Sequence, residues 1–398
     1  MIPRLKAALS LSELKAAFSF ANSDDVSLFE QEFARLSDHK YAVAFPYGRT
    51  GIVAVLKALD IECGEILCPA YTCVVVPHAI VISGNVPVFL DSSPEDMNMD
   101  LSLVEKAITE KTRAIVATSI FGYPVNLDLL DEIRQRYPDL IIIQDCAHSF
   151  FCEWNERPIH KEGLCAFYGL NVSKIMTSIF GGMVTTDDEN FARKLRTSRD
   201  DILVPASLTK SIKRLMYLLA VYPAFSNMGY SLVNRLERSG LLDYFVKYHD
   251  PKLIDMPVDY LQALTSIEAR VGVEQCHKYA KIIKHRRKLA RLYLNGLKGM
   301  PELELPVWNN GASWSHFVVR TECAKSLIDA CLEQDVQLGE LIDYNIPDLP
   351  AYYNYEHHSL GYSGNLPEQV INLPVHMSCS FNDAKKIVVL IVKEMDKK

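Results

Sequence analysis

From residue 41 to residue 186, short apolar segments alternate with segments of helical periodicity, and this alternation restricts the chain to few folds. The apolar segments are rich in β-branched and aliphatic residues, which favour strands. One of them, Leu140-Ile141-Ile142-Ile143, is apolar at every position, as a strand covered on both faces requires. The pattern predicts a mostly parallel α/β sheet. Its seven strands are expected at residues 41–45, 65–68, 86–90, 114–118, 140–144, 165–168 and 183–186, and helices at 50–60, 72–83, 101–109 and 126–137.

Composition and charge exclude several classes of protein. The chain of 398 residues is 49% hydrophobic, which is enough for a large core and argues against disorder. Its net charge of −7 argues against nonspecific binding to nucleic acid. The ten cysteines form no C-x-x-C pair, so neither a zinc site nor a disulfide framework is indicated. The first residues lack the apolar core of a signal peptide, and the longest apolar run, residues 215–225, is too short to span a bilayer. We therefore expect a cytoplasmic enzyme.

The residues that follow each strand carry the functional signal, because ligands of parallel α/β sheets bind beyond the carboxyl ends of the strands. Gly48-Arg49-Thr50-Gly51 follows the first strand and opens a helix. Glycines, a hydroxyl and the free N–H groups of a helix N-terminus suit a phosphate, although an ordinary strand-to-helix turn has a similar composition. The segment is neither a P-loop nor a G-x-G-x-x-G sequence.

Two further segments carry titratable side chains. Asp145 and His148 follow the fifth strand, where they could hold a heterocycle or a metal, or simply cap a helix and face solvent. Lys174 lies in an apolar segment between the sixth and seventh strands. Lysine is seldom buried without a reason, and burial lowers its pKa and makes the amine nucleophilic. The alternative is an exposed loop lysine.

The order of these three signals matches what pyridoxal phosphate requires. A lysine forms a Schiff base with the cofactor aldehyde. A carboxylate keeps the pyridine nitrogen protonated, so that the ring takes up electrons. An anion site binds the phosphate. The combination predicts an enzyme that uses this cofactor, held by Lys174, Asp145 and the turn at residues 48–51.

Motifs along nearly the whole chain resemble those of one enzyme family. Asp145-Cys146-Ala147-His148 resembles a D-x-A-[HQ] motif, and Ser173-Lys174 followed by Gly181-Gly182 resembles a lysine loop. Leu373-Pro374-Val375-His376 resembles an L-P-x-x turn. Further matching segments lie at residues 28–34, 41–44, 64–72, 87–91, 98–100 and 120–122. By these segments the chain is similar to the DegT/DnrJ/StrS sugar aminotransferases, which are fold-type I pyridoxal-phosphate enzymes.

The resemblance implies roles for the catalytic residues. Lys174 would carry the Schiff base and then act as the base that moves a proton during the transfer. Asp145 would pair with the pyridine nitrogen, and His148 would lie close to the cofactor ring.

The resemblance also implies which residues surround these groups. Gly48, Arg49 and Thr50 would bind the cofactor phosphate through backbone and side-chain groups. Tyr71 or Thr72, at the exit of the second strand, would lie near the cofactor or the substrate.

Departures from the family pattern cluster around the phosphate and the substrate mouth. Arg49 stands where the family has glycine in Ser-Gly-Thr, and a guanidinium suits a phosphate. The family serine five residues before the lysine falls on Gly169, and the glutamate before the paired glycines falls on Phe180. The Asn-Tyr-Arg segment that reaches across the family dimer has no clean match near residues 261–263. Because of these changes the resemblance does not identify the substrate. The expectation of Schiff-base chemistry is unaffected.

The implied activity is the transfer of an amino group from glutamate to a keto group of a nucleotide-linked sugar, for surface polysaccharide or related glycoconjugates, by a homodimer. One alternative is deoxysugar dehydration, which family members carry out with histidine in place of the lysine, so Lys174 argues against it. Another is a catalytically silent scaffold, for which Gly169 and Phe180 give slight support.

The resemblance implies an aspartate-aminotransferase-like large domain at residues 1–255 and a smaller C-terminal α/β domain at residues 256–398. Residues 207–236, in the divergent part of the large domain, mix basic and apolar side chains, which favours an interface or core helix over a helix on a membrane surface. Residues 281–298 predict a long amphipathic helix with a solvated basic face, a nucleotide-diphosphate role being the alternative. Residues 352–358 predict an exposed aromatic loop at the substrate entrance.

Overall fold

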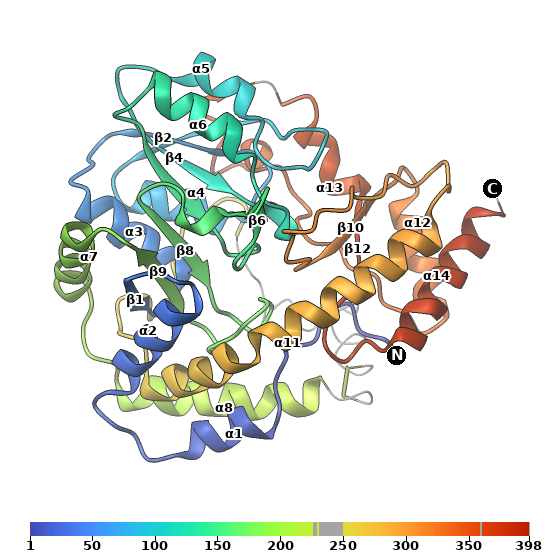
Figure 1. Ribbon diagram of the computed structural model, residues 1–398, viewed down its shortest axis with the longest axis horizontal. Coiled ribbons are helices and arrows are strands. Elements are labelled where there is room, and N and C mark those ends of the chain that lie inside the picture. The colour runs from blue at the N-terminus through green and yellow to red at the C-terminus, as the bar shows by residue number, and fades with distance from the viewer. Residues whose placement is uncertain (226–228, 231–249, 359, 398) are drawn as a thin grey trace.

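The computed structural model describes residues 1–225, 229–230, 250–358 and 360–397. Its centre is a sheet of eight strands in the order β1-β9-β8-β5-β4-β2-β3-β11 (Figure 1). In this sheet β9 is antiparallel to its two neighbours β1 and β8, and the other pairs are parallel. The strands are β1 (Tyr41–Phe45), β2 (Glu65–Pro69), β3 (Val86–Leu90), β4 (Thr112–Thr118), β5 (Ile141–Asp145), β8 (Cys165–Gly169), β9 (Gly182–Thr186) and β11 (His357–His358). The seven predicted strands are confirmed, and β11 is an addition to them.

Strand β11 corrects the prediction of an exposed aromatic loop at residues 352–358. His357 and His358 pair with Phe89 and Leu90 of β3 and extend the sheet by one edge strand. Tyr352 is fully buried, with its ring edge-on to Phe89. The aromatic side chains of this segment therefore include core residues. The sequence did not indicate this, because polar residues lie between and after the aromatic ones.

Alternate residues of the strands supply two separate cores, because successive side chains point to opposite faces of a sheet. Val43 and Phe45 pack with α3 (Gly48–Ala58), α4 (Val75–Ile82) and α7 (Glu189–Ile202). Ala42 and Ala44 lie in the other core, with α2 (Asp25–Leu36), α6 (Leu127–Arg136) and the first half of α11 (Ser266–Leu297). Both faces are covered by helices, which explains why the strand sequences are apolar throughout.

A third core lies in the C-terminal part of the chain. Here β10 (Phe317–Arg320) pairs with β12 (Val370–Leu373), and Trp314 and Phe317 are fully buried beside helices of this part. Helix α11 runs from the large sheet to this core across the molecule (Figure 1). The division at residues 255 and 256 remains a prediction. The other elements are α5 (Val104–Ala107), α12 (Ala324–Glu333), α13 (Leu366–Gln369), α14 (Phe381–Met395), β6 (Glu153–Trp154) and β7 (Arg157–Pro158).

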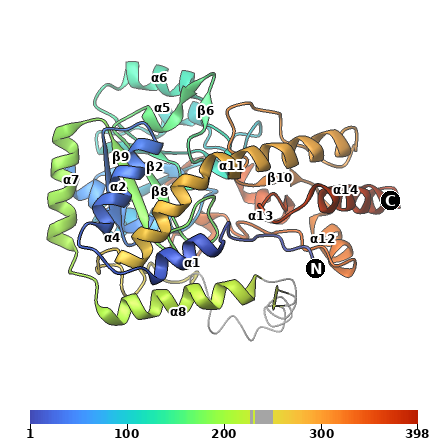
Figure 2. The ribbon, with the colours of Figure 1, turned by 60° about the horizontal axis from the view of Figure 1, so that its bottom comes forward.

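Helices α1 (Leu11–Phe18) and α8 (Leu208–Ala224) lie together outside the layer formed by α2 and α11 (Figure 2). The Tyr222 hydroxyl donates to the Ser10 carbonyl at 2.6 Å. Helix α8 buries the basic residues Lys210 and Arg214, while Ile212 and Met216 are exposed. Of the predicted segment 207–236, residues 226–228 and 231–236 lie outside the described residues. No helix within the described part of the chain is long and apolar enough to cross a membrane.

Candidate active site

A pocket opens where the carboxyl ends of several strands meet, as the sheet topology predicts. Four of its walls come from segments that follow β1, β2, β5 and β8. It is lined by Tyr47, Gly48, Arg49, Ile52, Thr72, Cys73, Val75, Val76, Thr118, Asp145, Ala147, His148, Phe167, Gly169, Leu170, Asn171, Lys174 and Gly181. Of the predicted site residues, the structure brings together Lys174, Asp145, His148, the turn residues Gly48 and Arg49, and Thr72.

Asp145 is the last residue of β5 and is buried. Its two carboxylate oxygens accept hydrogen bonds from the Ala147 N–H at 2.9 Å and from the Thr118 hydroxyl at 3.1 Å. Burial raises the pKa of Asp145, although the Ala147 N–H, the positive charge of Lys174 and the Thr118 hydroxyl act against the rise. Among the described residues no cation lies within ion-pairing distance of this carboxylate. Such a site favours a positively charged group that enters the pocket.

Lys174 lies in a tight excursion between β8 and β9. The Leu170 N–H donates to the Gly181 carbonyl at 3.0 Å, which closes the base of this excursion. The Lys174 N–H donates to the Asn171 carbonyl at 3.1 Å, and the side chain faces the pocket. Burial lowers the pKa of the Lys174 ammonium, while nearby Cys73 and Asp145 act against the fall. The neutral, nucleophilic amine is therefore more abundant here than on an ordinary surface lysine.

His148 stands between rings from two distant parts of the chain. Its ring stacks on Phe121 at a centroid distance of 6.0 Å and lies 5.0 Å from the ring of His316. The Phe121 N–H is directed at Nδ1 of His148 at 3.4 Å, from a backbone with a φ of 57°. Burial lowers the pKa of His148 well below its ordinary value, and Lys174 and His316 lower it further. The imidazole is therefore neutral near pH 7.

The turn after β1 exposes helix N–H groups. Helix α3 begins at Gly48, and its N-cap residue Tyr47 makes no side-chain cap hydrogen bond. The first N–H groups of a helix lack partners inside the helix and attract anions. The end of the lysine excursion approaches this turn closely at Gly182. A Cβ on Gly182 would lie 2.4 Å from the Gly48 nitrogen, so only glycine fits there. Arg49 lines the pocket beside them.

Two predicted residues do not reach the pocket wall. The buried Thr50 donates its hydroxyl to the Tyr260 carbonyl at 3.2 Å, so only its backbone N–H is left for an anion. Tyr71 is fully buried in the C-terminal core, and its hydroxyl donates to the Ile342 carbonyl at 3.2 Å. Thr72 is the member of this pair that lines the pocket.

The sequence did not identify two other pocket residues, Thr118 and Tyr47, or His316, which lies beside the pocket against the ring of His148. Thr118 ends β4 in register with Asp145, so the strand pattern alone could have identified it. His316 follows Asp145 by 171 residues in a segment without a motif, and burial lowers its pKa to about 3. Tyr47 lines the pocket as well, and only the fold assigns its hydroxyl a partner.

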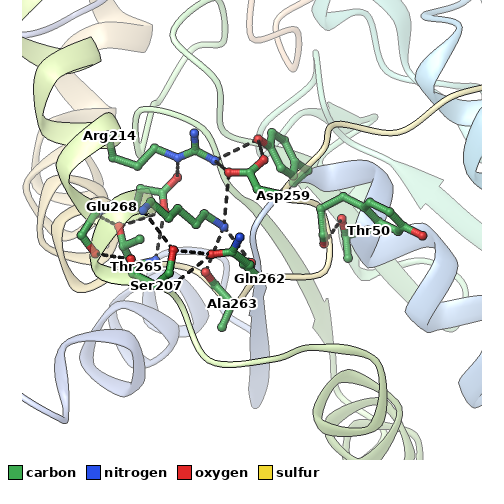
Figure 3. A network of polar contacts seen from close by, with 12 residues as sticks. Thr50, Ser207, Arg214, Asp259, Gln262, Ala263, Thr265 and Glu268 are labelled. Atoms are coloured by element: carbon green, nitrogen blue, oxygen red, sulfur yellow. Dashed lines mark hydrogen bonds and ion pairs between the residues drawn. The ribbon is translucent and has the colours of Figure 1, made fainter.

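A network of buried and partly buried polar groups, which includes Arg214, Asp259 and Glu268, is shown in Figure 3. It adjoins the pocket because its member Tyr47 also lines the pocket. Arg214 of α8 donates to Glu268 of α11 at 2.8 Å and to Asp259 at 2.8 Å. The Tyr47 hydroxyl donates to Asp259 at 2.6 Å and accepts from Arg214 at 2.9 Å. The guanidinium also lies 4.3 Å from the ring centroid of Phe180, which precedes the paired glycines. The network thus joins the phosphate turn, the lysine excursion, α8 and α11.

The residues present fit pyridoxal phosphate. The uncapped N-terminus of α3 and Arg49 suit its phosphate, and the buried, unpaired carboxylate of Asp145 suits a protonated ring nitrogen. Lys174 supplies a buried amine in the same pocket. The fold and this pocket fit the class of enzymes that depend on pyridoxal phosphate.

Comparison with known proteins identifies the particular family. Residues 8–392 match the DegT/DnrJ/EryC1/StrS aminotransferase family, and the chain belongs to this family. Among solved structures, it is similar to DesV of S. venezuelae, determined in complex with a ketimine intermediate, with 22% identity over 97% of this chain and 95% of that chain and a TM-score of 0.77. It is also similar to Helicobacter pylori PseC, an aminotransferase involved in the biosynthesis of pseudoaminic acid, with 16% identity over the whole of both chains and a TM-score of 0.79.

A third similar structure belongs to an enzyme with a different activity. It is a GDP-4-keto-6-deoxymannose-3-dehydratase, ColD, determined as a mutant with bound GDP-perosamine. The identity is 19% over 98% of this chain and 100% of that chain, with a TM-score of 0.76. The fold alone therefore does not separate transfer from dehydration.

Proposed function

We propose that this chain transfers an amino group from glutamate to a keto group of a nucleotide-linked sugar. The observation that carries the proposal is the placement of an unpaired buried carboxylate, Asp145, in one pocket with a lysine whose pKa is lowered. A purely structural role explains neither group, because an uncompensated buried charge destabilises a fold. Family membership and the similarity to DesV and PseC support a sugar as acceptor.

Each residue of the pocket has a defined task in this proposal. When bound, pyridoxal phosphate supplies an electron-accepting ring that makes the amino group and its neighbouring carbon labile. Asp145 holds a proton on the ring nitrogen through its carboxylate oxygens, which Thr118 and Ala147 orient. Lys174 first offers its neutral Nζ as the nucleophile and, once released, takes up and returns a proton at the same atom.

The remaining residues orient the cofactor and exclude water. The N–H groups at the start of α3 and the Arg49 side chain bind the phosphate. The neutral imidazole of His148, whose Nδ1 accepts from the Phe121 N–H, would lie close to the cofactor ring. We further propose that the enzyme acts in the cytoplasm as a homodimer and serves the synthesis of surface polysaccharides or related glycoconjugates.

Two half-reactions test this proposal. Holoenzyme is mixed first with L-glutamate, and the absorbance change and released 2-oxoglutarate are measured. It is then given keto-sugar nucleotides, and the product is weighed by mass spectrometry. An amino sugar formed in stoichiometric amount supports the proposal. A product that has lost water without gaining nitrogen would instead establish dehydration. If glutamate were not converted at all, the chain would be a catalytically silent homologue. Lys174 favours transfer over dehydration, because the dehydratases of the resembling family carry histidine there.

A further inference from the structure

The second half of α11 borders a groove that shares no lining residue with the cofactor pocket. The groove encloses about 750 Å³, which is within the range of about 300–1,000 Å³ typical of small-molecule sites. One wall is α11 itself, which crosses the front of the molecule in Figure 1. Trp308 and Asn310 also line it, and the segment after His148 contributes Phe151 and Glu153.

Four cationic side chains of α11 line this groove: Lys284, Arg287, Lys288 and Arg291. They recur every three or four residues, so they form one stripe that covers about 10 Å of helix axis at 1.5 Å per residue. Within the described part of the chain, none of the four forms an ion pair with a carboxylate. Glu153 is the one carboxylate among the lining residues.

This lack of partners distinguishes the stripe from the first half of the same helix. There Arg270 pairs with Asp25 at 2.6 Å and Lys278 pairs with Glu13 at 2.5 Å. In a chain with a net charge of −7, carboxylates are plentiful, so four adjacent unpaired cations on one groove indicate a binding site for an anion.

The groove also offers apolar surface beside the cations. Phe151, Tyr279 and Ile283 contribute to its lining, and the rings of Phe151 and Tyr279 meet edge-on at 4.9 Å. Trp308 is held between Trp314, stacked at 5.1 Å, and the Arg291 guanidinium, 4.5 Å from its ring centroid. The Arg287 Nε donates to the Ala312 carbonyl at 3.1 Å, which fixes the direction of its guanidinium. Four cations, of which Arg287 and Arg291 are held by contacts, stand beside an aromatic surface and suit a phosphorylated ligand that also carries a flat ring.

We propose that this groove is a second ligand site, separate from the cofactor pocket, that binds a nucleoside diphosphate. The diphosphate lies along Lys284, Lys288 and Arg291, and the nucleoside lies on the apolar surface of Phe151 and Tyr279. This inference stands independently of the proposed function, because it rests on the groove and not on the reacting pocket.

Calorimetric titration of the holoenzyme tests it, because bound cofactor then occupies the anion site of α3. The probes are ADP and inorganic pyrophosphate. The test variant is the triple substitution Lys284→Gln, Lys288→Gln and Arg291→Gln, which removes charge but keeps good helix formers. The matched control is Lys281→Gln, an exposed lysine of the same helix that does not line the groove.

We expect ADP to bind the wild type with a Kd of about 1–100 μM, more tightly than pyrophosphate. The triple variant should bind ADP at least tenfold more weakly, and the control should match the wild type. Four results would overturn the proposal: no ADP binding by the wild type, equal binding by the triple variant, an equal loss in the control, or pyrophosphate binding as tight as that of ADP.

Discussion

Two groups of buried charges lie side by side in this protein and are treated in opposite ways. In the network of Arg214, Glu268 and Asp259, each charge has an opposite charge at 2.8 Å. In the cofactor pocket, Asp145 is buried with no cation at ion-pairing distance among the described residues, and burial lowers the pKa of Lys174. Buried charges that are paired with opposite charges hold a fixed geometry. Buried groups without such a partner have shifted pKa values and are typical of binding and catalytic sites. We therefore propose a structural role for the first group and a chemical role for the second.

The largest expected effect is on activity, at Lys174. Lys174→Arg keeps a positive charge near Asp145 but removes the titratable amine, because arginine stays protonated. Amine transfer from glutamate should fall by more than about 10³-fold, the order of magnitude lost with a proton-transferring group. The thermal midpoint should change little. If the variant retained a tenth of the wild-type rate, Lys174 would not be the reacting group. The chemical role proposed for the unpaired charges of the pocket would then be wrong.

The largest expected effect on stability is at Glu268. Glu268→Gln preserves the capping box with Thr265 but leaves Arg214 without its buried partner. Removal of one member of a buried pair lowers the free energy of unfolding by about 3–5 kcal/mol. Urea denaturation of the variant and the wild type measures this loss. The double variant Arg214→Leu with Glu268→Leu should lose less free energy of unfolding than the single variants Arg214→Leu and Glu268→Leu lose together. Additive losses would contradict the view that this pair acts as a balanced unit.

A pH-dependent effect is expected at Asp259. Burial alone would raise its pKa, but the Tyr47 hydroxyl and the Arg214 charge outweigh burial and leave the pKa below its ordinary value. The stability that Asp259 contributes is therefore complete above the ordinary aspartate pKa of about 4 and is lost as pH falls through the lower folded-state pKa. Asp259→Asn should lose about 1–3 kcal/mol at pH 7 and at pH 5, with a narrowing gap below pH 4. Urea denaturation at these pH values checks this, and a gap that widened toward acid pH would contradict it.

The smallest expected effect is at Gly169. A Cβ here would lie at an ordinary contact distance of 3.4 Å from Lys174 Cε, and the residue has no left-handed backbone, so a side chain is tolerated. Gly169→Ser should restore the hydroxyl that the resembling family places at this position and tighten cofactor binding severalfold, about 1 kcal/mol for one hydrogen bond. Fluorescence titration of the apoenzyme measures this. The matched control Gly169→Ala should show no gain, and an equal gain in both would exclude the hydroxyl as the cause.

The fold and the placement of Asp145 and Lys174 in one pocket could be predicted because their signals are local. Each of the seven predicted strands is a short apolar run. Asp145 directly follows the fifth run, and Lys174 lies between the sixth and the seventh. The rest depends on contacts between distant segments. Arg214 is buried because Asp259 and Glu268, 45 and 54 residues away, meet it. His316 reaches His148 only through the packing of the C-terminal part onto the sheet. Neither distance leaves a periodic pattern in the sequence.

The most direct test of the central claim is chemical trapping of the cofactor. Purified protein saturated with pyridoxal phosphate is reduced with borohydride, digested and mapped by mass spectrometry. We expect one pyridoxyl group per chain on the peptide that contains Lys174. Prior treatment with L-glutamate should abolish the label by converting the cofactor to its amine form. A protein that takes up no cofactor, or a label on another lysine that glutamate does not remove, would contradict the assignment of this pocket as the site of amine transfer.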